Sequence, residues 1–300
     1  MNILTRCLLT AIAAVCMAAA TAVDSQAAGT AEQPSKPQTT YTKADSTLVV
    51  NLLADAGRQP AGTNLTLYFA RRLKGTPYVA HTLDGYAEER LVVNLRQLDC
   101  LTYVENVTAL TLCARQGRRT FADFCDALRR LRYRKDCATS YEARLHYFSD
   151  WIDDNASKGV CTEVQAPNPP FKAVQTVNVN YMSTHPSKYA MLKGRPQRIK
   201  AIAEAERRLS GTRRRYIPKA AVDNSALLRS TVKDGDIIAL TTTLAGLDIQ
   251  HVGFAVWHAD GLHLLNASSL RHKVVEEPKT LRRYLQGQPT MTGMRIIRLK

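Results

Sequence analysis

Cysteine thiols offer the first candidate chemistry in this chain of 300 residues. A cysteine can attack a carbonyl carbon, form a disulfide or pack as a small apolar side chain. No C-x-x-C pair occurs, so the spacing does not favour zinc, and we expect no metal. An odd number of cysteines follows the first 27 residues, so at least one thiol stays unpaired within the chain. They are Cys100, Cys113, Cys125, Cys137 and Cys161, and the pairing of the last four stays open.

The stretch RQLDCLTYVENVTAL favours Cys100 as the reactive thiol. Apolar residues recur after it at helical spacing, and Asp99 is a suitable N-cap, so we expect a helix that begins at Cys100. The N-terminus of a helix stabilises a thiolate, and its free N–H groups can hold an oxyanion. The alternatives are a cysteine packed beneath the helix or one paired with Cys113.

A nucleophilic thiol needs a base, and the base needs a group that orients it. The segments DIIAL, HVGFAVW and GLHLLNASS read as three successive short strands. His251 begins the second strand, and Asn266 lies late in the third. Because the start of one antiparallel strand lies near the end of its neighbour, we expect these two side chains to meet.

The order GTPY, LDC, DGD, HVGFAVW and LLNASS resembles the NlpC-type cysteine hydrolases of bacterial cell-wall metabolism. This resemblance implies an α+β, papain-like fold whose nucleophile begins a helix packed on an antiparallel, barrel-like sheet. It assigns the nucleophile to Cys100, the base to His251 and the orienting residue to Asn266. Tyr78 matches a tyrosine close to the nucleophile, where it can assist the oxyanion. The third position is commonly histidine in that superfamily, so Asn266 is a departure from the pattern.

A narrower resemblance rests on LDCLTYVENVTAL, RLHYFSDWI, STHPSKY and HVGFAVWHADGLHLLNASS, and it spans roughly residues 46–299. It points to a branch first catalogued as a domain of unknown function and similar to N-acetylmuramyl-L-alanine amidases. The implied reaction hydrolyses the amide between N-acetylmuramic acid and L-alanine through a thioester, without a cofactor. The polar residues of these motifs that could bind substrate are Arg144, His146, Tyr147, Asp150 and His185.

Three other functions remain open at this point. An endopeptidase of the same fold would cut within the stem peptide, since a fold does not determine the bond that is cleaved. A protein without catalytic activity would bind an envelope polymer through its basic surface. A lipid acyltransferase or thioesterase would need a hydrophobic hairpin near the nucleophile, and none is evident.

The N-terminal sequence predicts export. Residues 1–27 have the charged, apolar and small-residue regions of a signal peptide, and residues 28–45 read as a flexible leader. Residues 46–300 then form one domain, with a helical N-terminal part and a β-rich C-terminal part. We expect a monomer in the periplasm or outside the cell that acts on muropeptides and has no membrane span once the signal is removed. The formal net charge of +15 accompanies no nucleic-acid motif, so no nucleic acid is expected as a partner.

Overall fold

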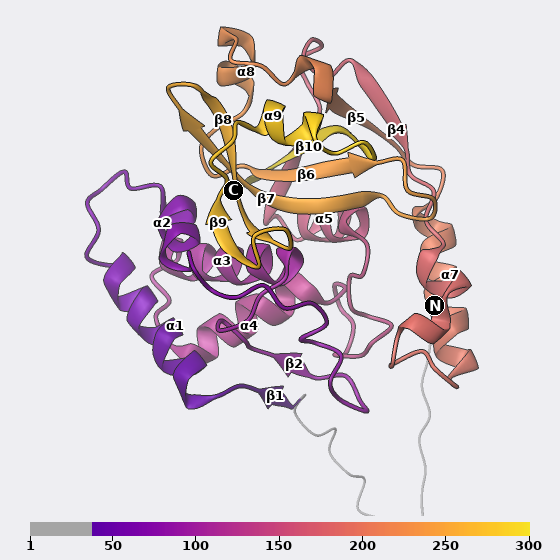
Figure 1. Cartoon of the computed structure of the whole chain (residues 1–300). Coiled ribbons are helices and arrows are strands. Elements are labelled where there is room, and N and C mark those ends of the chain that lie inside the picture. Colours follow the sequence, from indigo (N-terminus) through magenta and orange to yellow (C-terminus); the bar gives the residue numbers. More distant parts are fainter. Residues whose placement is uncertain (1–37) are drawn as a thin grey trace, which may run out of the picture. The chain divides into compact units, whose positions relative to one another are not determined.

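A computed structural model describes residues 38–300 (Figure 1). The signal peptide expected over residues 1–27 lies outside the described residues. The folded part begins before the boundary expected at residue 46, because β1 (Thr39–Thr40) pairs in parallel with β2 (Leu91–Val92). The last residues of the expected leader are therefore part of the fold.

The helices that precede the main sheet have well-defined starts. At α1 the side chains of Thr42 and Asp45 cap each other's backbone N–H, and Asp45 also accepts from Leu95 N–H, which fixes the helix against the next segment. The helices of this part are α1 (Lys43–Ala56), α2 (Leu65–Arg72), α3 (Cys100–Arg115), α4 (Phe121–Arg132) and α5 (Phe148–Ser157). The later ones are α6 (Tyr181–Thr184), α7 (Pro196–Leu209), α8 (Ala226–Thr231) and α9 (Leu281–Gln286), with 3-10 turns η1 (Pro186–Lys188) and η2 (Lys219–Ala221).

The main sheet is antiparallel and has the strand order β4-β5-β10-β6-β7-β8-β9, and β3 also pairs with β10. The strands predicted from DIIAL, HVGFAVW and GLHLLNASS are β6, β7 and β8, so these predictions are confirmed. The bounds are β3 (Cys161–Val164), β4 (Ala173–Thr176), β5 (Arg213–Pro218), β6 (Ile237–Thr242), β7 (Ile249–His258), β8 (Gly261–Ser268), β9 (Lys273–Glu276) and β10 (Met291–Leu299).

The expectation of a barrel-like sheet is wrong. Among the described residues the outer strands β4 and β9 do not pair with each other, so the sheet is open. The physical reason is that helices bury both of its faces. In Figure 1, α1–α4 lie on one side of β6–β9, and α8 and α9 lie on the other. A sheet covered on both faces does not need to close on itself to bury its apolar side chains.

Alternate residues of β7 enter different cores. Phe254 packs in the larger core with α1–α5, and Ala255 packs in a second core with α8 and α9. A third cluster joins Tyr147 to apolar residues of α6 and α7. The larger core positions the start of α3 against β7, because Tyr103 meets Phe254 with ring centroids 5.6 Å apart.

Candidate active site

Cys100 is the first residue of α3, as the sequence predicts. The Asp99 side chain accepts a hydrogen bond from Thr102 N–H at 2.8 Å, and the Thr102 hydroxyl accepts from Asp99 N–H at 2.9 Å. This capping box holds the chain entering the helix and thereby the direction of the first side chain. Cys100 therefore lies on a rigid element.

The surroundings of the Cys100 thiol favour its protonated form. Burial raises its pKa to about 12, and the negative charge of Asp99 adds to this effect. The N–H groups of Val252, Leu101 and Cys100 itself act in the opposite direction, since they hydrogen-bond to the sulfur. The expected stabilisation of a thiolate by the helix N-terminus is present, but burial outweighs it.

His251 and Asn266 meet as expected. The His251 Nε2 atom lies 2.8 Å from Asn266 Oδ1, and Asn266 is fully buried. The Asn266 amide N–H groups donate to the carbonyl oxygens of Leu264 and Val275, which leaves Oδ1 as the acceptor facing the imidazole. Nε2 must then carry the proton, so Nδ1 of His251 is free to accept one.

Burial lowers the pKa of His251 below its usual value, although Asn266 acts against this shift. The ring is consequently neutral near pH 7. A neutral imidazole beside a protonated thiol can serve as a general base.

A cavity of about 230 Å³, which we call the Asp248 cavity, connects the thiol with the imidazole. It lies where the start of α3, the start of α5 and the start of β7 meet. Its lining residues are Cys100, Leu101, His146, Tyr147, Phe148, Met182, Tyr189, Leu247, Asp248, Ile249, Gln250, His251 and Val252.

A second cavity of about 340 Å³, the Tyr78 cavity, shares Cys100, Leu101 and His146 with the first. Burial raises the pKa of Tyr78 to about 12, with a further contribution from the negative charge of Asp99, so its hydroxyl is a hydrogen-bond donor near the thiol. Arg144 also lines this cavity and pairs with Asp84 at 2.7 Å. Two cavities meeting at one thiol can accept the two sides of a scissile bond.

The expected substrate-binding residues separate into two groups. Arg144, His146 and Tyr147 line the cavities beside Cys100. Asp150 instead binds Arg134 in a bidentate ion pair at 2.9 and 2.7 Å, and it lines neither cavity. His185 is exposed, stacks on Tyr181 with ring centroids 4.4 Å apart, and also lies outside both cavities.

Sequence reasoning missed three polar residues of the Asp248 cavity, namely Asp248, Gln250 and Tyr189. Asp248 and Gln250 lie within three positions of His251, at the start of the same strand. This nearness in the sequence was the signal that could have identified them. Tyr189 lies in the motif STHPSKY, where His185 was selected in its place.

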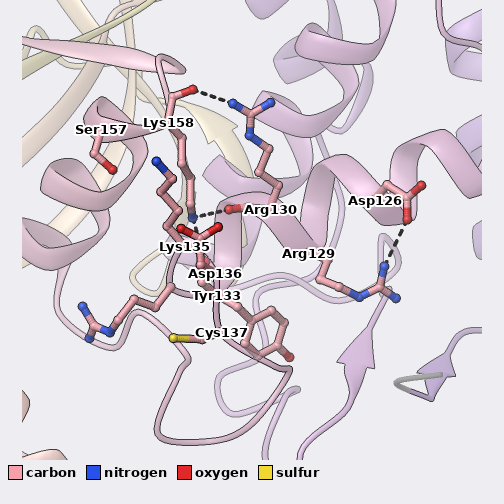
Figure 2. A pocket seen from close by; sticks show the side chains of 10 residues that line it. Asp126, Arg129, Arg130, Tyr133, Lys135, Asp136, Cys137, Ser157 and Lys158 are labelled. Atoms are coloured by element: carbon pink, nitrogen blue, oxygen red, sulfur yellow. Dashed lines mark hydrogen bonds and ion pairs between the residues drawn. The ribbon is translucent and has the colours of Figure 1, made fainter. Parts of the chain in front are cut away.

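A third cavity, drawn in Figure 2, is lined by neither Cys100 nor His251. It carries Arg129, Arg130, Arg134, Lys135 and Lys158, the first four of which come from the basic stretch RRLRYRKD. Three of these cations are already paired with carboxylates, those of Asp126, Asp150 and Asp154. We interpret this region as an ion-paired surface.

Residues 38–300 contain no group of three or more histidine, cysteine or acidic side chains placed to hold a metal ion. No helix in the same range is long and apolar enough to cross a membrane. The five cysteines of this range are all unpaired thiols.

A family model described as AmiA-like, N-acetylmuramoyl-L-alanine amidase-like, matches residues 68–292. The chain resembles the crystal structure of an N-acetylmuramoyl-L-alanine amidase from Bacteroides uniformis, with 35% identity and a TM-score of 0.73 over 82% of this chain and 99% of that one. The structures that share this mixed α and β architecture thus include an amidase. This protein is a member of the AmiA-like family.

Two further structures are similar. One, from Bacteroides fragilis, is described as a "putative xylanase" and has 38% identity and a TM-score of 0.72 over 77% of this chain and 99% of its own. A DUF1460 protein from Legionella pneumophila has 22% identity and a TM-score of 0.64 over 85% of this chain and 94% of its own, and shows the fold alone. No curated protein matches the chain.

Proposed function

We propose that this protein is an exported N-acetylmuramoyl-L-alanine amidase that releases the stem peptide from muropeptides. The observation that carries the proposal is the hydrogen bond from His251 to Asn266 beside Cys100, in a chain of the AmiA-like family. The names of the relatives from Bacteroides uniformis support the same bond.

In the proposed reaction His251 Nδ1 takes the proton of the Cys100 thiol, and the sulfur attacks the lactyl carbonyl carbon of N-acetylmuramic acid. The imidazolium returns the proton to the nitrogen of L-alanine, the C–N bond breaks, and a thioester remains on Cys100. A water molecule, deprotonated by the same imidazole, then hydrolyses the thioester and restores the thiol. The step uses only groups of the chain and water.

The developing oxyanion needs hydrogen-bond donors that are already in place. The N–H groups directed at the Cys100 sulfur, together with the protonated Tyr78 hydroxyl, are suitable donors in this region. Arg144, His146 and Tyr147 line the two cavities, and His146 is the one of the three whose Nδ1 atom has no hydrogen-bond partner among the described residues and can bind substrate.

We further propose that the fold is of the NlpC type within the papain-like superfamily. A cysteine at the start of a helix, followed along the chain by a histidine and a polar residue on adjacent antiparallel strands, supports this relation. Export to the periplasm or outside the cell rests on the signal-like residues 1–27.

Glycoside hydrolysis, suggested by the name of the Bacteroides fragilis relative, fits the site less well. That reaction commonly requires two available carboxyl groups on either side of the scissile bond. In the Tyr78 cavity the carboxylates are already engaged: Asp84 pairs with Arg144, Asp99 caps α3 and Glu105 pairs with Arg132.

The test is mass spectrometry of defined muropeptides after incubation with the protein, with Cys100→Ala and with Cys137→Ala. We expect a free peptide that begins with L-alanine, formed by the parent protein and by Cys137→Ala, whose missing thiol is exposed and lies outside both cavities. Cys100→Ala should release none. Products cut within the stem peptide would make the protein an endopeptidase, and unchanged activity of Cys100→Ala would refute the proposed nucleophile.

A further inference from the structure

The Asp248 carboxylate is unusual among the charged groups near Cys100. Its side chain is 2% exposed, yet it lines the cavity shared by Cys100 and His251. One oxygen accepts from Ser149 N–H at 2.6 Å and so caps α5, whose N-cap residue Tyr147 provides no side-chain cap. Within residues 38–300 the other oxygen has no hydrogen-bond donor, and the carboxylate has no ion-pair partner. A buried carboxylate in this condition favours a ligand that supplies donors and positive charge.

His146 adds a second acceptor to the cavity. Its Nε2 lies 2.7 Å from the Tyr141 carbonyl oxygen, which can only accept, so Nε2 carries the hydrogen. Burial and the nearby charge of Arg144 lower the pKa of His146 to about 3, and the ring stays neutral. Its Nδ1 atom is therefore an acceptor without a proton. The Tyr147 hydroxyl does not compete as a donor, because it donates to Glu206 at 2.6 Å.

The remaining walls are mostly apolar. They come from α3, from the segment around α6 and η1, and from the entrance to β7, and include Leu101, Met182, Leu247 and Ile249. No lysine or arginine lines the cavity. Gln250, whose oxygen accepts from Thr242 and Thr290, and Tyr189 offer donors elsewhere in the lining, whereas Asp248 and His146 offer acceptors. The end of the cavity at Asp248 fits an aliphatic arm with an ammonium head, since an ammonium has three donors and no acceptor. A carboxylate would be repelled there.

We propose that the Asp248 cavity binds an aliphatic primary ammonium group of the substrate, held by the free oxygen of Asp248. This inference rests on the proposed function, in which the ligand is a muropeptide, and it assigns the group to a diamino acid of the stem peptide. Charge attraction is stronger there than at the surface, because Asp248 is 2% exposed. Lysine and diaminopimelate are the two sources to be distinguished.

The experiment is isothermal titration calorimetry with Cys100→Ala protein, so that no bond is cut. The ligands are muramyl tripeptides that end in lysine or diaminopimelate, each with a free and with an N-acetylated side-chain amine. We expect the free amine to bind about 10-fold more tightly or better for at least one of the two residues. In the double variant Cys100→Ala, Asp248→Asn this preference should fall to near unity. Asparagine retains an oxygen to accept from Ser149 N–H, so the cap of α5 survives the loss of charge.

Glu204→Gln in the same background is the control for the loss of one negative charge, because Glu204 is half exposed on α7 and lies outside the cavity. The Cys100→Ala, Glu204→Gln protein should retain the preference for the free amine. Equal affinity for free and acetylated amines would overturn the inference, as would equal weakening of both ligands by Asp248→Asn. A muropeptide that binds with the amine preference but is never cleaved by the unmodified protein would refute the proposed reaction and leave this inference standing.

Discussion

At Cys100, burial and the helix N-terminus act on the same thiol in opposite directions. Burial prevails and raises its pKa to about 12, while burial lowers the pKa of His251. Both shifts favour the neutral forms of the two groups, in contrast to sites that hold a preformed thiolate beside an imidazolium. In the proposed reaction the proton therefore leaves the thiol as the sulfur attacks the substrate, and the rate depends on the position of His251 Nδ1.

This resting state predicts the pH dependence of activity. As pH falls through the lowered pKa of His251, the imidazole takes a proton and can no longer act as a base, so the acidic limb of kcat/KM should lie below pH 6.5, the ordinary value for histidine. The variant Asn266→Asp places a negative charge on the imidazole, which stabilises its protonated form and should move this limb to higher pH. A pH–rate profile of both proteins measures the shift.

A different result would contradict the role assigned to His251. An acidic limb that does not move in Asn266→Asp would mean that the limb reports a group other than His251. Alkylation of Cys100 by iodoacetamide gives an independent control, because a protonated thiol should react slowly at pH 7 and faster as pH rises.

At the scale of elements, the close approach of β7 and β8 positions the base. A Cβ atom on Gly253 would lie 2.8 Å from the Leu265 carbonyl oxygen and 2.9 Å from Asn266 Cβ. Only a residue without a side chain allows the two strands to approach this closely beside the His251–Asn266 hydrogen bond.

We predict that Gly253→Ala separates these strands, costs about 1–3 kcal/mol of the free energy of unfolding and lowers kcat through displacement of Asn266. Gly287→Ala is the matched control, since its new Cβ would be 3.6 Å from the nearest atom outside its neighbours, an ordinary contact. Urea unfolding and initial rates measure the two effects. Unchanged kcat in a folded Gly253→Ala protein would show that the spacing of the strands does not position the base.

The elements that carry the pair were predictable from sequence because their signals are local. The N-cap at Asp99 and the apolar strand of His251 depend on neighbouring residues only. The Asp248 cavity was not predictable, since its walls come from α3, α5, the α6 region and β7. Asp150 and His185 lie outside both cavities, and the sequence could not predict this, because the polarity of a residue does not indicate toward which neighbour its side chain points.

It was likewise not predictable from the sequence that the main sheet would be open. Successive apolar strands indicate antiparallel pairing, but they do not specify whether the outer strands meet. That outcome depends on α8 and α9, which cover the second face and are only six residues long each.

For the molecule as a whole, stability depends on an ion pair within the larger core. Arg132 Nε donates to Glu105 at 2.7 Å, with both side chains at most 2% exposed, and its Nη1 donates to the Val92 carbonyl at 2.7 Å. This pair joins α3, α4 and β2. Burial nevertheless raises the pKa of Glu105, so the carboxylate depends on its cation.

We predict that Arg132→Met destabilises the protein by about 3–5 kcal/mol, because Glu105 is left buried without a partner. Adding Glu105→Gln should recover part of this loss. The exposed pair Arg208–Glu204 supplies the control, and Arg208→Met should change stability by about 1 kcal/mol or less. Urea denaturation curves compare the variants. If Arg132→Met and Arg208→Met lower the free energy of unfolding by similar amounts, the buried ion pair contributes no more to stability than the exposed pair.

The position of β10 in the sheet has a consequence for biosynthesis. Met291–Leu299 follows every other strand along the chain, yet it pairs with β3, β5 and β6 in the middle of the sheet. The ribosome must therefore have synthesised β10 before β3, β4 and β5 can join β6–β9 in one sheet. Until then a nascent chain carries Cys100 and His251 on segments that the completed sheet does not yet hold in place.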